Sequence, residues 1–97
     1  MSEPIALPIP ADHPVFAGHF PGQPIVPGAL LLDLAIVAIE AQLGRKVSSV
    51  AQAKFLSPAL PGEPVSLSFD AQADSVRLTL LSGERSLATA RLNLQAA

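Results

Sequence analysis

Two ionisable side chains stand out within a mostly apolar part of this sequence. His19 lies in a loop rich in proline and glycine, and Asp33 follows it fourteen residues later, near the start of a strongly apolar run. Imidazole changes its protonation near neutral pH and can act as a general base. A carboxyl group among apolar side chains is costly as an anion and holds its proton more strongly than one in water. Without further evidence, the simpler interpretation of Asp33 is a carboxylate that faces solvent or bonds to nearby backbone groups. A catalytic role for Asp33 therefore depends on what surrounds it.

The apolar run predicts the helix that positions Asp33. Twelve of the fifteen residues in the segment 29–43 are apolar, and they leave no polar face. A helix that is apolar all round is buried in a protein core or lies in a membrane. The run is shorter than the roughly 20 residues needed to cross a bilayer, and Asp33 and Glu40 interrupt it. We therefore predict a buried core helix over about residues 27–43, ended by Gly44, because glycine readily takes the left-handed conformation at this position.

The start of this helix predicts a place where negative charge can build up. Pro27 suits the first turn because its missing N–H would have no helical partner there. No Ser, Thr, Asp or Asn stands at the cap, so water or a ligand must satisfy the N–H groups of Gly28 and Ala29. The helix dipole would favour a ligand oxygen that gains negative charge. Gly28, which has no side chain, would let that ligand approach closely.

The remaining residues predict short antiparallel strands around the helix. Residues 5–9 indicate an edge strand, because Pro8 has no N–H for a central ladder. A hairpin turn is predicted at residues 82–84. Apolar and polar residues alternate, as in half-buried strands, in four segments: 47–56, 65–72, 76–80 and 87–94. One helix and such a sheet make an α+β fold, and the length predicts a single domain over residues 1–97.

Composition excludes several classes of function. The net charge is −2, and the six basic residues are scattered, so nucleic acid is not an expected partner. The chain has no cysteine, which excludes disulfides, thiol nucleophiles and cysteine-based zinc sites. The first residues lack the basic and long apolar regions of a signal peptide, so we expect a cytoplasmic protein that is not in a membrane. A small chain with a helix apolar on every face has surplus surface to bury, which predicts a homodimer or a larger assembly.

Two blocks of sequence resemble hotdog-fold 3-hydroxyacyl-[acyl carrier protein] dehydratases of the FabA and FabZ type. The first block reads Gly18-His19-Phe20-Pro21-Gly22-x-Pro24-x-x-Pro27-Gly28-x-Leu30-x-x-Asp33. The second, residues 53–63, is similar to the family's strand with a basic residue and a Phe, followed by a Pro-Gly-acidic turn. Asp at the helical position resembles the 3-hydroxydecanoyl branch and the short dehydratases of aryl-polyene-type pathways. The chain departs from the family at Val37, where a Gln often holds the acid, and it is shorter than the longer dehydratases.

The resemblance implies a fold, an activity and a set of site residues. The fold would be a long central helix wrapped by a curled antiparallel sheet, with protomers paired along that helix. The activity would be dehydration of 3-hydroxyacyl thioesters, linked to an acyl carrier protein, to trans-2-enoyl thioesters in fatty acid or polyene-type biosynthesis. His19 would be the base and Asp33 the acid, with no cofactor and no metal. The residues implied for the oxyanion and substrate are Gly28, Phe20, Pro21, Gly22, Val26 and Pro27.

Two other functions remain open at this level. On the same fold a thioesterase would use Asp33 to activate water and would not need His19. Alternatively, the chain is a non-catalytic subunit of a hetero-oligomeric dehydratase and supports an active, related partner. Carrier proteins are acidic, so Arg45, Lys46 and Lys54 are candidate docking residues. Assays of enoyl-thioester hydration and of thioester cleavage distinguish the two chemistries.

Overall fold

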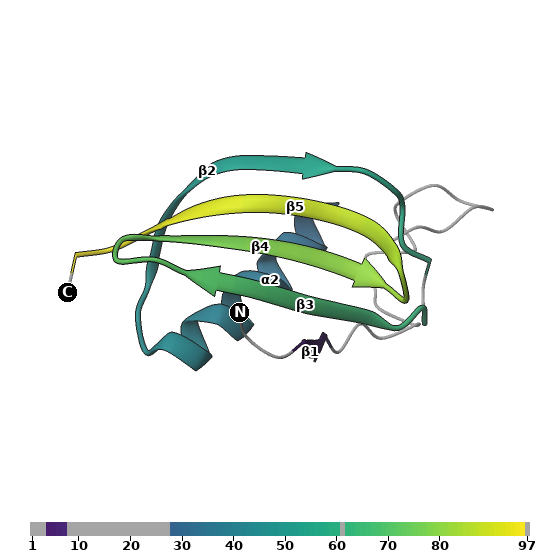
Figure 1. Ribbon diagram of the computed structural model, residues 1–97, viewed down its shortest axis with the longest axis horizontal. Helices are drawn as coiled ribbons and strands as arrows, with labels where there is room; N and C mark the ends of the chain where they lie inside the picture. The colour runs from purple at the N-terminus through teal and green to yellow at the C-terminus, as the bar shows by residue number, and fades with distance from the viewer. Residues whose placement is uncertain (1–3, 8–27, 61, 97) are drawn as a thin grey trace.

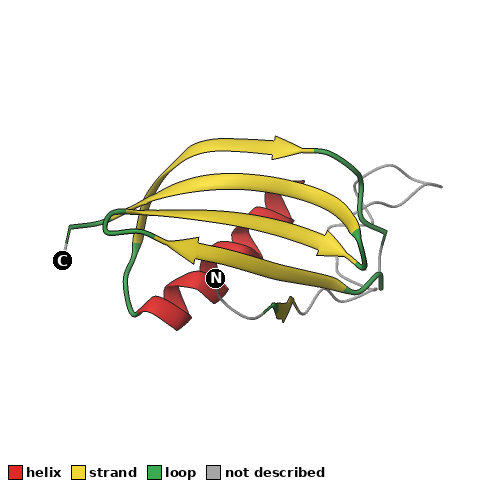
Figure 2. Ribbon diagram, in the orientation of Figure 1, coloured by secondary structure: helices red, strands yellow, loops and turns green. Residues whose placement is uncertain are grey.

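The described part of the chain forms one helix and five strands in two layers (Figures 1 and 2). The structure is a computed structural model, and it describes residues 4–7, 28–60 and 62–96. The elements are β1 (Ile5–Leu7), α2 (Gly28–Leu43), β2 (Val47–Phe55), β3 (Val65–Ala71), β4 (Ser75–Ser82) and β5 (Arg85–Leu94). The strands pair antiparallel in the order β1-β3-β4-β5-β2. Helix α2 lies across one face of this sheet and contacts both edge strands, β1 and β2.

The predicted secondary structure is confirmed where the chain is described. The helix covers Gly28–Leu43, and its predicted first residue, Pro27, lies outside the described residues. Gly44 ends the helix with a φ of 65°, and its N–H donates to the Glu40 carbonyl oxygen at 2.9 Å. The Glu40 carboxylate then accepts a 2.9 Å hydrogen bond from the Val47 N–H, which fixes the start of β2. The short strand β1 stands at an edge of the sheet, as Pro8 predicted.

The core lies between the sheet and one row of the helix. Alternate residues of β3 and β4 point towards α2, and their side chains are buried together with those of the helix row that faces them. Burying a large aliphatic side chain contributes roughly 1.5–3 kcal/mol, so this layer holds the helix in place. The central buried residues are Leu31, Ala35, Ile39, Val65, Leu67, Phe69, Val76, Leu78 and Leu80.

The helix is not buried all round within one chain. One row of side chains faces the sheet, but the opposite row, Ala29, Asp33, Val37 and Ala41, is exposed. Residues four apart share a face of a helix, so these four form a continuous stripe, which we call the outward row. The Val37 side chain is 64% exposed. A single-layer sheet covers only one side of a helix, so the expectation of burial on every side fails for the isolated chain.

Strand β2 also exposes apolar side chains. It pairs with β5 on one side, and among the described strands it has no neighbour on the other. Val50 and Phe55 are 43% and 55% exposed, although the sequence predicted a half-buried strand. The cause is position, because β2 lies at the edge of the sheet and α2 contacts only a small part of it. The free edge of β2 and the outward row therefore leave apolar surface that one chain does not bury.

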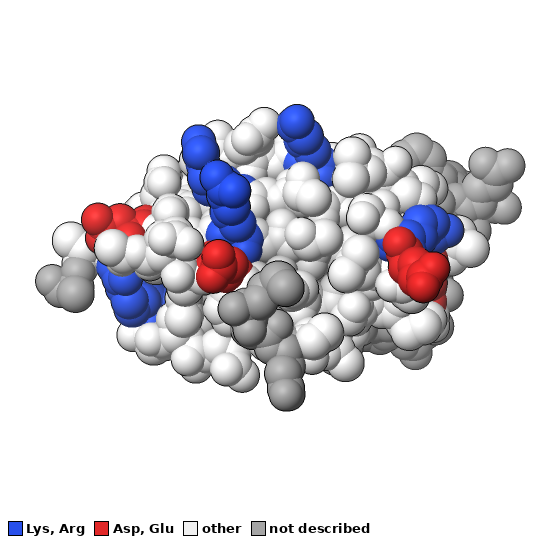
Figure 3. All heavy atoms as spheres, viewed as in Figure 1, with Lys and Arg blue, Asp and Glu red and all other residues white. Residues whose placement is uncertain are grey.

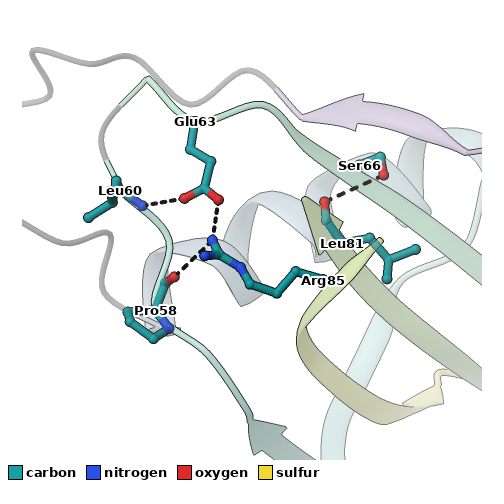
Figure 4. Close-up of polar contacts among 6 residues, drawn as sticks. All are labelled: Pro58, Leu60, Glu63, Ser66, Leu81 and Arg85. Atoms are coloured by element: carbon teal, nitrogen blue, oxygen red, sulfur yellow. Dashed lines mark hydrogen bonds and ion pairs between the residues drawn. The ribbon is translucent and has the colours of Figure 1, made fainter. Parts of the chain in front are cut away.

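The turn between β2 and β3 is held by a carboxylate (Figure 4). Glu63 accepts a 2.8 Å hydrogen bond from the Leu60 N–H and forms an ion pair with Arg85. Arg85 also donates to the Pro58 carbonyl oxygen at 3.3 Å, so it joins this turn to the start of β5. The Leu60 N–H, a hydrogen bond with Ser82 and the Arg85 charge together lower the pKa of the Glu63 carboxyl. The predicted Pro-Gly-acidic turn thus has a structural role in this chain.

We predict that Glu63→Gln lowers the free energy of unfolding at neutral pH by about 1 kcal/mol, because it removes a charge that two donors stabilise. Since the pKa of Glu63 is lowered in the fold, its stabilisation is fully present above the ordinary carboxyl range. It is lost as the pH falls from about 4.3 through the folded value. Urea unfolding at pH 7 and pH 3 should show the difference from wild type shrinking at the lower pH. The control is Glu84→Gln, which changes an exposed acid in the β4–β5 turn. If Glu63→Gln lowers the free energy of unfolding equally at both pH values, the stabilising role of the ionised Glu63 carboxylate is contradicted.

Candidate active site

The structure describes the helical half of the predicted site. Gly28 opens α2, and Asp33 lies five residues further along the same helix. The other predicted site residues lie outside the described residues: His19, Phe20, Pro21, Gly22, Val26 and Pro27. The described part of the site is therefore the surroundings of Gly28 and Asp33.

An apolar hollow of about 400 Å³ opens beside the first turn of α2. Ala29 and Leu31 line it on the helix side, together with the backbone of Gly28. The end of β2 and the residues after it line the other side, through Phe55, Leu56, Ser57 and Pro58. Its volume is within the range of small-molecule sites, which are mostly apolar with a few polar groups. The hollow could hold the acyl or thioester part of a ligand.

Gly28 is required for close contact with an aromatic ring. A Cβ atom added at Gly28 would lie 2.7 Å from two ring carbons of Phe55, closer than real Cβ contacts. The sequence suggested that Gly28 makes room for a ligand, whereas in the structure the Phe55 ring takes up that room on one side. Sequence reasoning did not name Phe55 as a site residue. The signal available was its place in the second family-like block, directly after a basic residue.

The first turn of α2 supplies the polar part of this hollow. Backbone N–H groups in the first turn of a helix have no partner within the helix, and the dipole makes this end positive. The hollow reaches these groups at Gly28 and Ala29. An oxygen that gains negative charge would be stabilised here. Gly28 as an oxyanion position stays a prediction, since the residues that precede it lie outside the described part of the chain.

Asp33 lies in the outward row of the helix and does not line the hollow. It lies one turn beyond Ala29, and side chains four residues apart on a helix are about 5–6 Å apart at their Cβ atoms. We expected apolar side chains to enclose Asp33, but in the single chain its side chain is exposed. It makes no hydrogen bond or ion pair with another residue in the described part of the chain. Val37, the next residue in the row, offers no hydrogen bond, so any enclosure of Asp33 must come from outside the described residues.

The predicted docking residues have different surroundings. Arg45 donates to the carbonyl oxygens of Ala73 and Gln95 at 2.6 and 2.7 Å, and lies 3.8 Å from the carboxylate of Asp74. These contacts tie the end of the helix to the far end of the sheet, so Arg45 has a structural role in the described part of the chain. Lys46 and Lys54 are exposed. Lys54 precedes Phe55 in β2 and therefore points to the opposite face of the sheet from the hollow.

The described residues contain no group of three or more His, Cys, Asp and Glu side chains placed to hold a metal ion. The helix described here is also too short to cross a membrane.

Comparison with known proteins identifies the family. The family model described as ApeI dehydratase matches residues 3–91. This chain belongs to the ApeI-like family. It is 32% identical over 85 residues to the 3-hydroxyacyl-[acyl-carrier-protein] dehydratase FabZ of Haemophilus influenzae, an alignment that covers 77% of this chain. The alignment covers 57% of that FabZ protein, so the chain matches less than two thirds of its relative.

Solved structures confirm the predicted α+β hotdog fold. The Dehydratase Heterocomplex ApeI:P from Xenorhabdus doucetiae matches with a TM-score of 0.83 at 23% identity, covering 96% of this chain and 86% of that one. An uncharacterized protein from Erwinia carotovora matches with a TM-score of 0.77 at 28% identity, covering 95% and 81%. At this level of identity the ApeI:P match concerns the fold, and the family rests on the sequence match.

We predict that Gly28→Ala changes the hollow more than it changes stability. Alanine favours a helix by up to about 1 kcal/mol over glycine, and the half-exposed Phe55 ring can turn away from the new methyl group. Binding of an acyl thioester should therefore weaken several-fold while the melting temperature moves little. Phe55→Ala in the Gly28→Ala background removes the clash and should recover part of the binding. If the double variant binds no better than Gly28→Ala alone, the Gly28–Phe55 contact does not control the hollow.

Proposed function

We propose that this chain dehydrates 3-hydroxyacyl thioesters, carried on an acyl carrier protein, to trans-2-enoyl thioesters in fatty acid or polyene-type biosynthesis. The observation that carries this proposal is the apolar hollow at the positive end of α2, with Asp33 one turn beyond its lining. Membership of the ApeI-like family and the FabZ relative support the same reaction. The motif from Gly18 to Asp33 lies within the matched residues.

The reaction needs a base, an acid and a place for negative charge. In this proposal His19 takes the proton from C2 of the substrate, and the electrons of that bond form the C2–C3 double bond. The C3–O bond breaks, and Asp33 gives its proton to the departing hydroxyl, so that water leaves. During proton removal the thioester oxygen gains negative charge, and the Gly28 N–H stabilises it at the helix N-terminus. No metal or organic cofactor takes part in these steps.

The remaining motif residues shape the substrate site in this proposal. Residues that contact the oxyanion or the substrate in this proposal, and that lie outside the described part of the chain, are Phe20, Pro21, Gly22, Val26 and Pro27. The acyl chain lies in the hollow against Leu31 and Phe55, both of which line it. The apolar lining suits an acyl group, whose transfer from water contributes about 0.8 kcal/mol for each buried CH₂.

The active assembly in this proposal contains a second subunit that covers the outward row and β2. Both surfaces expose apolar side chains in the single chain, including Val37 and Val50. A subunit placed there would take Asp33 out of water, as its role as an acid requires. That subunit is a second copy of this chain or a related hotdog subunit. The ApeI:P structure, which is described as a heterocomplex, supports the second possibility.

We predict that His19→Ala and Asp33→Asn each abolish enoyl-thioester hydration, the reverse of the proposed reaction. If one copy supplies His19 and the other Asp33, the two inactive variants should complement each other after unfolding and refolding together. The expected recovery is about a quarter of wild-type activity, because about half of randomly mixed dimers are hybrids and each hybrid holds one intact site.

The same assay distinguishes the alternatives. If hybrids form but hydration activity does not recover, His19 and Asp33 belong to the site of one chain. Full hydration activity in the His19→Ala variant would overturn the dehydratase proposal. Thioester cleavage that depends on Asp33 and not on His19 would instead support a thioesterase. A purified chain that is active only with a related subunit would support the hetero-oligomer.

We predict that wild type forms a dimer or larger assembly at micromolar concentration, and that Val37→Lys dissociates it. Val37 lies in the middle of the outward row, and burying a long charged side chain in an interface that fits valine is costly even with Asp33 one turn away. Light scattering measures the mass of both proteins. Leu60→Lys is the matched control, because Leu60 is also exposed, at 54%, but lies in the β2–β3 turn. A monomeric wild-type protein would contradict this interface. So would a Val37→Lys variant whose assembly has the same mass as that of wild type.

A further inference from the structure

The face of the sheet that points away from α2 carries a second hollow, lined mainly by polar and basic side chains. It has a volume of about 310 Å³ and lies over β2, β4 and β5. Figure 3 views this side of the molecule and shows basic side chains on it, with an acidic side chain next to two of them. We call this hollow the outer hollow, and its lining residues are Gln52, Lys54, Arg77, Leu78, Thr79, Thr89, Ala90 and Arg91.

The strand register brings the three basic residues of the outer hollow together. Arg77 of β4 lies directly opposite Arg91 of β5. Lys54 of β2 lies opposite Thr89, two residues from Arg91 on the same face of β5. Opposite residues in an antiparallel pair have Cβ atoms about 4.5–5.5 Å apart, and like charges placed so are unfavourable. Three positive charges therefore share one small area of the sheet.

One acidic residue stands beside these three charges, and it offsets only part of them. This residue is Asp70 of β3, which lies directly opposite Arg77 on the side away from Arg91. Arg91 has Arg77 on one side and Gln52 on the other. Neither arginine forms a hydrogen bond or ion pair with the residues that the structure describes, unlike Arg45 and Arg85. The outer hollow thus keeps unused donors around a site of positive charge.

We propose that the outer hollow binds a phosphate group, either inorganic phosphate or the phosphate monoester of a larger molecule. The planar guanidinium groups of Arg77 and Arg91 match phosphate oxygens in pairs of hydrogen bonds. Lys54 adds a third charge, and the hydroxyls of Thr79 and Thr89 add further donors. A phosphate dianion between the arginines offsets the repulsion between their charges. A single carboxylate has only one negative charge and offsets it less. This site is separated from the candidate active site by the thickness of the sheet and does not depend on the proposed reaction.

The test measures thermal stability and binding of the full chain with inorganic phosphate and with phenyl phosphate. Sodium chloride and sodium acetate at matched ionic strength are the control salts. We expect saturable stabilisation by phosphate or its monoester beyond the effect of the controls. Tighter binding of phenyl phosphate would indicate an organic monoester as the ligand, and tighter binding of inorganic phosphate would indicate the free ion.

Substitution of Arg91 gives two signatures at once. Arg91→Gln should weaken phosphate binding about tenfold or more, since it removes a charged donor. The same variant should melt at a higher temperature than wild type in low salt without phosphate, because the opposition to Arg77 is relieved. Lys46→Gln, which removes an exposed charge outside the outer hollow, is the matched control and should bind phosphate as wild type does. Equal stabilisation by chloride and phosphate, or full phosphate binding by Arg91→Gln, would overturn the proposal.

Discussion

The arrangement of this protein depends on an apolar helix that a single-layer sheet can cover on only one side. Leu31, Ala35 and Ile39 are buried against the strands, and this contact fixes where α2 lies. The opposite row is exposed and has no cover among the described residues, and it carries Asp33 and the apolar Val37. The carboxylate proposed to act as an acid therefore stands on the surface through which a second subunit would bind. Binding of a second subunit to this surface would therefore both form the assembly and bury the carboxyl group of Asp33.

Strand β2 connects the two surfaces on which the functional proposals rest. It follows α2 along the chain and pairs with β5 at one edge of the sheet. Successive side chains of a strand point to opposite faces. Phe55 accordingly packs on the first turn of α2 beside the apolar hollow, while Lys54 lines the outer hollow. Neighbouring residues thus line chemically different hollows.

The polar contacts outside these sites mainly hold the ends of elements. Glu40 fixes the step from the helix into β2, and Arg45 ties the helix end to the far end of the sheet. Glu63 and Arg85 hold the turn after β2, which also lines the apolar hollow through Pro58. A family-like motif can therefore contain residues that support a site without touching a ligand. In the second block of this sequence, Glu63 has that role and Phe55 lies at the hollow itself.

Local features of the sequence determined the elements. The apolar run predicted the helix, Gly44 its end, and alternation the strands, because these depend on neighbouring residues and on the periods of helix and strand. The motif around Asp33 also pointed to the family, although His19 and the residues around it lie outside the described part. Only the tertiary structure decided that β2 is an edge strand, that Asp33 faces outward, that Phe55 rests on Gly28, and that Arg77 opposes Arg91. Each of these depends on which distant segments pair and in which register, and a one-residue shift in register would turn every side chain of a strand to the other face.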